Sequence, residues 1–164
     1  MPNILSSARV AIEALMAQVW PQCAGLFRVH DAERMNWRYF VAIQEAGQVN
    51  GLEPPWAVMQ PESALPDDNG LANDAYLLTV NCWYIAGLRG PAGTAKSSTE
   101  VHEEVEAALR ALQQTALANN SGGFDIFESS LDMSTSNPAN KYFMNVNAPF
   151  FGGMLSLRLR IGDT

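Results

Sequence analysis

Residues 76–85 read Tyr-Leu-Leu-Thr-Val-Asn-Cys-Trp-Tyr-Ile, a nearly continuous apolar run between two segments rich in loop-forming residues. Successive side chains of a strand point to opposite faces of the sheet, and here both faces are largely apolar. A strand that is apolar on both faces needs neighbours packed against both of them. The run therefore predicts a strand at the centre of a sheet.

A helix is predicted after this strand, beyond a loop at 87–98 that is rich in Gly, Pro, Ala and Ser. Ser97-Ser98-Thr99-Glu100 fits a capping box, in which a side-chain oxygen accepts a hydrogen bond from a backbone amide of the first turn. Several glutamates follow, and negative charge is favourable near the N-terminal end of a helix. The helix is expected over 99–118, with one apolar stripe made of Val101, Val105, Ala108, Leu109, Leu112 and Ala116.

The first part of the chain predicts another amphipathic helix. Apolar residues recur at helical spacing over 4–20, and Pro21 ends the pattern. Residues 25–30 then suggest a short strand, whereas 37–43 fit either a helix or a strand.

A further strand is predicted at 56–60, where Pro61 ends it. Prolines, aspartates and asparagines crowd the segment 61–74, which we expect to be a long exposed loop.

The C-terminal part is expected to be β structure. Its last strand alternates, so Ser156, Arg158 and Arg160 should point outward while Leu155, Leu157, Leu159 and Ile161 point inward. The predicted elements are a strand at 124–133, a turn at 137–140, a strand at 142–148, a tight connection at 150–153 and a final strand at 155–161.

The order helix, strands, helix, strands predicts an α+β fold. We expect a single domain over 1–164, with two principal α-helices packed on a mainly antiparallel or mixed β-sheet. The 164 residues are 48% hydrophobic and 16% charged, which suits one core.

Charge and hydropathy exclude several partners. Ten Lys and Arg against seventeen Asp and Glu give a net charge of −7, which repels phosphate, so no sequence-specific nucleic acid is expected. No apolar run is long enough to span a membrane, and the first residues lack the pattern of a signal peptide. We therefore expect no membrane partner and synthesis in the cytoplasm.

Two candidate ligand sites fail on spacing. The loop from Gly90 to Ser97 joins a strand to a helix as a P-loop does, but its lysine does not directly follow the last glycine. His102 would need a second histidine one turn further along the helix to form a zinc-binding pair, and Glu106 stands there. We expect no cofactor and no metal.

Catalytic patterns are also missing. Cys23 and Cys82 are expected to be reduced thiols, and neither lies in a recognisable catalytic setting. A carboxylate pair, such as Asp125 with Asp132 or Glu128, stays open because such pairs form only in the folded chain. No catalytic residue is assigned.

Two features suggest contact with other proteins. Arg158 and Arg160 are close together in an acidic chain, so they fit either a subunit boundary with an acidic surface or a solvated sheet face. Large rings mostly fill cores, although one or two of the tryptophans could anchor an interface. These tryptophans are Trp20, Trp37, Trp56 and Trp83.

The order of elements resembles that of the tail terminator and tail completion (neck) proteins of long-tailed bacteriophages. The resemblance is carried by the proline-ended first helix, the strand Trp56-Ala57-Val58-Met59 before a long loop, the strand at 76–85 and the helix at 99–118. Phe124-Asp125-Ile126-Phe127 and the ending from Gly153 to Ile161 are similar to that family's last strands.

The resemblance implies a non-enzymatic virion protein, made in the host cytoplasm, that forms a hexameric ring on the head-proximal end of the tail tube. Such a ring stops tube polymerisation and joins the head, so the implied partners are copies of itself, the tail tube protein and a head-tail connector protein. Heterologous ring surfaces and loops suit this role. The interface residues expected are Arg89, Lys96, Arg158, Arg160, Asp67 and Asp68.

Two alternatives stay open. The chain could be a soluble binding or immunity-type module for a basic partner, for which its negative charge is the motivating feature. It could also be a small carboxylate-dependent enzyme whose acidic residues converge in three dimensions.

Overall fold

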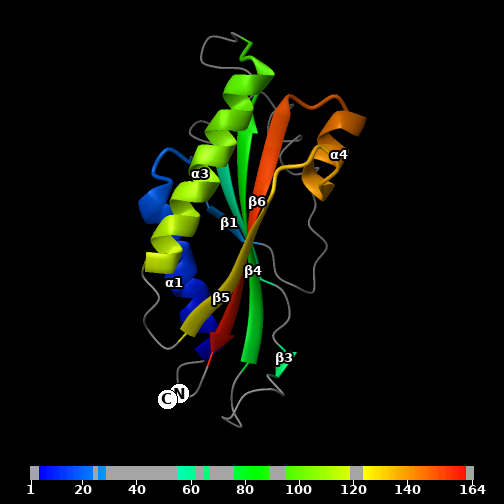
Figure 1. The fold of residues 1–164 in the computed structure, drawn as a ribbon. Helices are drawn as coiled ribbons and strands as arrows, with labels where there is room; N and C mark the ends of the chain where they lie inside the picture. Colours follow the sequence, from blue (N-terminus) through cyan, green and yellow to red (C-terminus); the bar gives the residue numbers. More distant parts are fainter. Residues whose placement is uncertain are drawn as a thin grey trace.

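A computed structural model describes residues 4–23, 26–28, 55–61, 65–66, 76–88, 95–118 and 124–161. The described part is one twisted sheet with helices on both faces (Figure 1). Helices α1 (Ile4–Val19) and α3 (Ser98–Ala118) cover one face, and α4 (Pro138–Asn145) packs on the other. The α+β prediction is confirmed, and α4 adds a third helix to the two that were predicted.

The strand order in the sheet is β1-β2-β4-β6-β5, and the short β3 pairs with β4 outside this path. Strands β2, β4, β6 and β5 are antiparallel, whereas β1 runs parallel to β2. The strands are β1 (Leu26–Arg28), β2 (Trp56–Pro61), β3 (Leu65–Pro66), β4 (Tyr76–Gly87), β5 (Phe124–Asp132) and β6 (Phe150–Ile161). The prediction of a central strand is confirmed, because β4 lies between β2 and β6.

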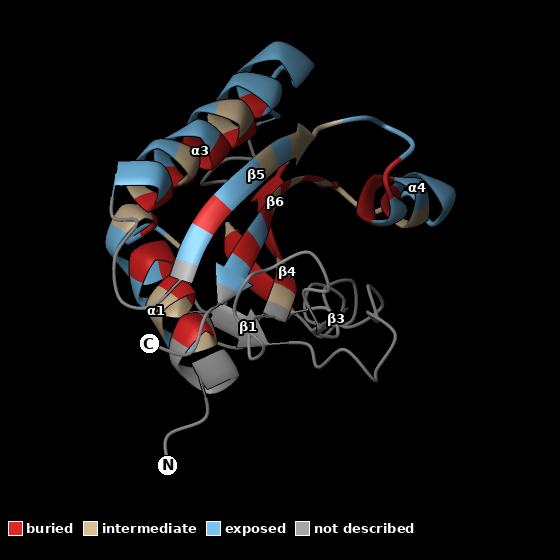
Figure 2. Cartoon of the chain, turned by 60° about the horizontal axis from the view of Figure 1, so that its bottom comes forward, coloured by how far each residue is buried: buried red, intermediate tan, exposed pale blue. Residues whose placement is uncertain are grey.

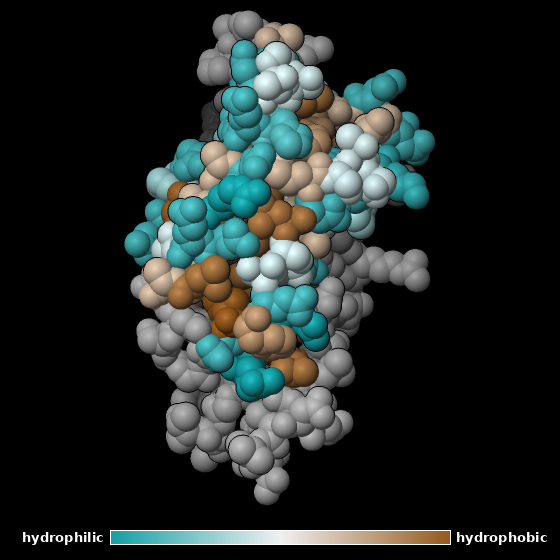
Figure 3. Space-filling model, in the orientation of Figure 1, coloured by the Kyte–Doolittle hydropathy of each residue, from teal (hydrophilic) through white to brown (hydrophobic). Residues whose placement is uncertain are grey.

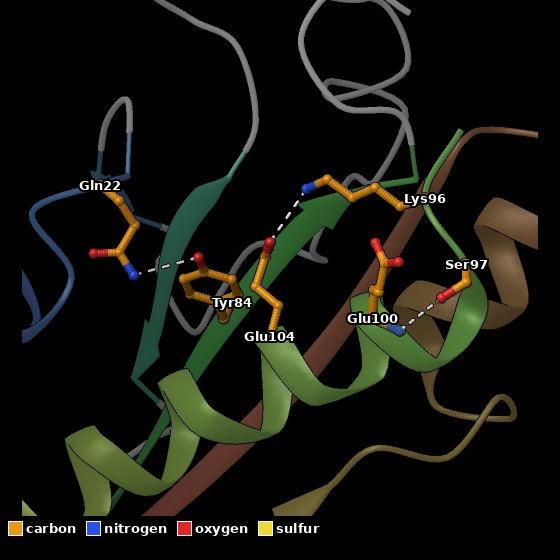
Figure 4. Close-up of polar contacts among 6 residues, drawn as sticks. All are labelled: Gln22, Tyr84, Lys96, Ser97, Glu100 and Glu104. Carbon is orange, nitrogen blue, oxygen red and sulfur yellow. Dashed lines mark hydrogen bonds and ion pairs between the residues drawn. The ribbon is translucent and has the colours of Figure 1, made fainter. Parts of the chain in front are cut away.

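Helix α3 follows the sequence pattern closely. Its buried residues are the six of the predicted stripe, and they face α1 and the sheet. At its start the Ser97 hydroxyl accepts a hydrogen bond from the Glu100 amide, with the nitrogen and oxygen 3.1 Å apart (Figure 4). Helix α1 packs beside α3, and the Trp20 indole donates a hydrogen bond to the Ala108 carbonyl at 2.8 Å. Both predicted helices are therefore confirmed.

The turn predicted at 137–140 and the strand predicted at 142–148 are wrong, because α4 occupies this segment. The Asn137 side chain caps the helix by accepting from the Asn140 amide, and Pro138 takes a first-turn position that needs no amide donor. These are helix-start signals, although Asn and Pro also favour turns.

Apolar side chains pack helix α4 against the sheet. Ala139 and Phe143, one turn apart, pack into an apolar cluster with Trp56, Val58, Trp83, Ile85 and Phe150. Tyr142 is half-buried and Met144 is exposed. The apolar residues that suggest an alternating strand here are therefore spread around a helix with a single buried face.

A buried carboxamide joins α4 to β6. The Asn140 side chain donates to the Gly152 carbonyl at 2.8 Å and accepts from the Gly152 amide at 2.7 Å. The same nitrogen donates to the Ser134 carbonyl at 3.0 Å. The register between β5 and β6 ends at Asp132 and Met154, so Asn140 satisfies the β6 backbone just beyond the end of β5.

The tight connection predicted at 150–153 is also wrong, because both glycines lie inside β6. A Cβ atom at Gly153 would lie 2.6 Å from Val105 Cγ1 and 2.7 Å from Leu109 Cδ1. At Gly152 it would lie 2.6 Å from Ile85 Cδ1. These glycines allow close approach of side chains to the backbone rather than a turn.

Smaller differences concern the loops. Part of the predicted loop at 61–74 forms β3, and the loop predicted to begin at residue 87 starts later because β4 continues through Gly87. The prediction for 37–43 lies outside the described residues. None of the helices that the structure describes has the length and hydropathy to cross a membrane.

Candidate interaction surface

An exposed phenylalanine of β5 lies between two arginines of β6. The guanidinium carbons of Arg158 and Arg160 are 5.3 and 5.4 Å from the centre of the Phe127 ring. Both distances are in the range of cation–π attraction, which contributes about 0.5–1 kcal/mol at exposed sites. We call Phe127, Arg158 and Arg160 the Arg-Phe patch.

Phe127 reaches the arginines because β5 is bulged. Ile126 lies opposite Leu159 and Glu128 lies opposite Arg158, so Phe127 is an extra residue with no partner in the register. A bulge bends the strand and redirects the side chain of the inserted residue. Ile126 is therefore buried under α3 while the next ring, 41% exposed, lies against the arginines.

Carboxylates surround the patch. Arg158 donates to Glu128 with the nitrogen and oxygen 2.9 Å apart, and Asp125 lies opposite Arg160 in the register. The Arg158 and Glu128 side chains are 45% and 54% exposed, so this ion pair contributes less than about 1 kcal/mol to stability. A guanidinium has five N–H donors, so one such bond does not exhaust its capacity to bind a further acceptor.

The predicted orientation of the two arginines is confirmed. Arg158 and Arg160 are exposed, and the leucines that alternate with them are buried on the helix-covered face. Exposed residues recur along β5, which lies at the edge of the sheet (Figure 2). The Arg-Phe patch thus lies at the margin of the sheet.

Lys96 is not part of this patch. Its ammonium lies 3.2 Å from the Glu104 carboxylate, beside the first turns of α3 (Figure 4). The structure therefore separates Lys96 from Arg158 and Arg160. The other predicted interface residues, Arg89, Asp67 and Asp68, lie outside the described residues.

The first turns of α3 form an acidic surface. Glu100 and Glu103 are exposed, and among the described residues neither carboxylate has an ion-pair partner. Glu106 accepts from Arg110 at 3.0 Å and lies 3.9 Å from the His102 ring nitrogen. Figure 3 shows hydrophilic residues along α3, with hydrophobic atoms reaching the surface in a few separate areas.

The two cysteines are poor nucleophiles. Burial raises the pKa of the Cys82 thiol to about 12. Burial, and secondarily the charge of Glu104, raises the pKa of the Cys23 thiol to about 12 as well. Because the thiolate is the reactive form, both side chains are unreactive thiols at neutral pH.

Tyr84 lies in the same region, under the start of α3. Burial raises the pKa of its phenol to about 12; Glu104 and Cys23 add to this effect, and a hydrogen bond from Gln22 opposes it. The Gln22 amide nitrogen is 3.3 Å from the phenol oxygen (Figure 4). This group is therefore a neutral structural phenol at neutral pH.

The carboxylates proposed as a catalytic pair are separated or engaged. Asp125 and Asp132 lie near opposite ends of β5, about 20 Å apart for an extended strand of this length. Asp132 accepts from the Ser134 amide and hydroxyl, and Glu128 from Arg158. Within the described ranges, no three His, Cys, Asp or Glu side chains gather as metal ligands would.

Comparisons with known proteins add no family. No protein-family model matches the chain, and no curated protein matches it significantly.

Two features were missed by sequence reasoning. The prediction of an unbroken strand gave Phe127 no role as a site residue. Ile126 and Leu131 both face α3 although their positions differ by an odd number of residues, which would put them on opposite faces of an unbroken strand. This spacing is a signal of the bulge. Met144 and Val146 at the end of α4 are also exposed, and Met144 lines a shallow open depression with Lys141.

The described tryptophans belong to the core. Trp20, Trp56 and Trp83 are each no more than 2% exposed. They cannot anchor an interface without unfolding, and Trp37 lies outside the described residues. Phe127 is the exposed aromatic ring among the large hydrophobic residues on the described surface.

Proposed function

We propose that this chain is a structural virion protein that caps the head-proximal end of a phage tail tube as a ring. In this role it stops tube polymerisation and presents the joining surface for the head. The Arg-Phe patch carries the proposal, because arginine and aromatic side chains are enriched among the residues that dominate protein interfaces. The order of elements that resembles the tail terminators supports the same role.

The partners proposed are further copies of the chain, the tail tube protein and a head-tail connector protein. A ring needs two different surfaces on each subunit, because each copy uses one surface on either neighbour. The Arg-Phe patch and the acidic start of α3 are two such surfaces of opposite chemistry. We place the protein in the virion after its synthesis in the host cytoplasm.

The test is native mass spectrometry of the purified chain, followed by negative-stain imaging with and without a tail tube protein. We expect hexamers and rings that cap the tubes. Phe127→Ala should reduce capping while the chain stays folded, because the ring is half-exposed and its contacts with the two arginines contribute little to stability. Val10→Ala is the matched control, since Val10 is an exposed apolar residue on α1 away from the patch. A chain that never assembles or binds tubes would refute the proposal.

The two alternatives receive less support. An immunity-type module would use the acidic surface at the start of α3, where Glu104 and Glu106 are engaged by Lys96 and Arg110 and only Glu100 and Glu103 have no ion-pair partner among the described residues. A carboxylate enzyme would need a pair of available acidic groups, but Glu128, the neighbour of Asp125 on one sheet face, is bonded to Arg158, and Asp132 is bonded to Ser134 near the other end of β5. The ring proposal uses surfaces that the described residues do present.

A further inference from the structure

The Arg-Phe patch and the acidic start of α3 are well separated in the fold. Helix α3 ends at Ala118, and β5 begins only a short connection later, at Phe124. The patch on β5 is therefore near the C-terminal end of α3. Glu100 and Glu103 are about 15–20 Å away along the helix axis, because Gln113 of α3 bonds Ser129, the residue after Glu128. Figure 1 shows α3 beginning at one end of the sheet, while β5 begins and β6 ends at the other.

The two surfaces offer exposed side chains of opposite charge: arginines in the patch, with Glu128 and Asp125 beside them, and glutamates at the start of α3. Arg158 and Arg160 are exposed neighbours on one sheet face. Glu100 and Glu103 are exposed carboxylates close to the helix N-terminus. The distance between these groups prevents them from pairing within one copy, so a second copy is the partner that brings them together.

We infer that the Arg-Phe patch of one copy binds the first turns of α3 of the next copy, head to tail. The occupant of the patch is thus a second copy of this chain, presented through Glu100 and Glu103. A contact between different surfaces of identical chains generates a ring when the rotation closes and an open filament when it does not. This inference rests on the proposed ring and names the contact that builds it.

Existing ion pairs do not block this contact. Arg158 uses one N–H donor on Glu128, and both groups are about half-exposed. Exposed pairs of this kind are weak, so a guanidinium can bind a second carboxylate while it keeps the first. Phe127 provides an apolar surface between the charges, which contact with a partner would remove from water.

The experiment uses two charge-reversed full-length variants. Variant A carries R158E and R160E, so both of its surfaces are acidic. Variant B carries E100R and E103R, so both of its surfaces are basic. Each variant alone should lose self-association by at least about a hundredfold, because like charges then meet at every contact. An equimolar mixture should regain it, with A and B alternating around the ring.

Native mass spectrometry at low ionic strength counts A and B in each assembly. The control is K141E, which adds negative charge at an exposed cation of α4 outside both surfaces. This control should assemble like the wild type. Thermal unfolding of A and B by circular dichroism checks that each is folded, and R158Q with R160Q replaces A if it is not.

The outcomes separate the contact from the ring. Mixed assemblies of equal A and B content support the contact. Rings formed by A alone or B alone overturn it and leave the proposed function standing. Wild-type chains that pair head to tail in this charge-dependent way, but form open chains that never cap tubes, support the contact and refute the ring. A wild type and a mixture that both stay monomeric overturn both.

Discussion

Replacing Gly153 with alanine tests the close packing of α3 on the sheet. The new methyl group would lie 2.6 Å from Val105 Cγ1 and 2.7 Å from Leu109 Cδ1, closer than carbon atoms approach without displacement. Leu109 has other rotamers, but Val105 is β-branched, and one χ1 rotamer dominates for valine in a helix. The helix must therefore shift away from β6 to admit the methyl group.

The size of the effect follows from two opposing contributions. Inserting a methyl group into a packed core costs about 1–3 kcal/mol. Replacing glycine with alanine also restricts the unfolded chain, which offsets about 0.4–1 kcal/mol. We expect the free energy of unfolding to fall by about 1–2 kcal/mol, which corresponds to a decrease in Tm of about 3–6 °C.

Urea unfolding followed by circular dichroism measures this change. Gly152→Ala is the matched control, because its methyl group would meet only the terminal Cδ1 of Ile85 at less than 3 Å. That end of a side chain moves more easily, so the control should lose less stability. In a double-mutant cycle, Gly153→Ala should cost less stability in a Val105→Ala background than in the wild type, because the shorter side chain relieves the clash. An unchanged or raised unfolding midpoint for Gly153→Ala would refute the packing argument.

Further predictions concern the buried Asn140 carboxamide, the cap of α3 and the two thiols. Asn140→Ala should lower the free energy of unfolding by about 1–3 kcal/mol, because the buried Gly152 N–H loses its side-chain acceptor while the Gly152 C=O keeps a hydrogen bond from Asn137; an unchanged urea midpoint would contradict this. Ser97→Ala should cost about 1 kcal/mol in thermal unfolding, and Ser97→Asp should retain the cap, so equal losses in both would argue against capping. The pKa of Cys82 is raised from 9.0 to about 12, so the unfolded state releases the thiol proton at a lower pH than the folded state does. The free energy of unfolding should therefore fall between about pH 9 and 12, by up to about 1.4 kcal/mol per pH unit from this group alone. With Cys23 similarly protonated, neither thiol should react readily with Ellman's reagent at pH 8 until urea unfolds the chain, and rapid labelling of the native state would count against this.

The elements with regular periodicity could be predicted from the sequence, whereas those set by tertiary contacts could not. The stripe of α3 repeats over several turns, so its buried residues were predicted correctly. Helix α4 has only 8 residues, and its burial is limited to the face that carries Ala139 and Phe143. A pattern this short fits a strand as well as a helix. Its docking site, the opposite face of the sheet, is known only from the fold.

The candidate surface was predictable in part. Alternation in the last strand placed Arg158 and Arg160 on one exposed face, as observed. The ring between them depends on a single inserted residue in β5, which no periodicity predicts. Gly152 and Gly153 were interpreted as a turn because a glycine pair usually marks one. Their role here is set by side chains of β4 and α3, which are distant in sequence.

The bulge at Phe127 also interrupts the edge of the sheet at β5. An unbroken strand at the margin of a sheet offers a regular row of amides and carbonyls to any other strand, and association of that kind can continue without limit. The extra residue interrupts this row where charged side chains flank it. Assembly through this margin, as in the proposed ring, should therefore depend on side-chain charge and weaken as salt concentration rises.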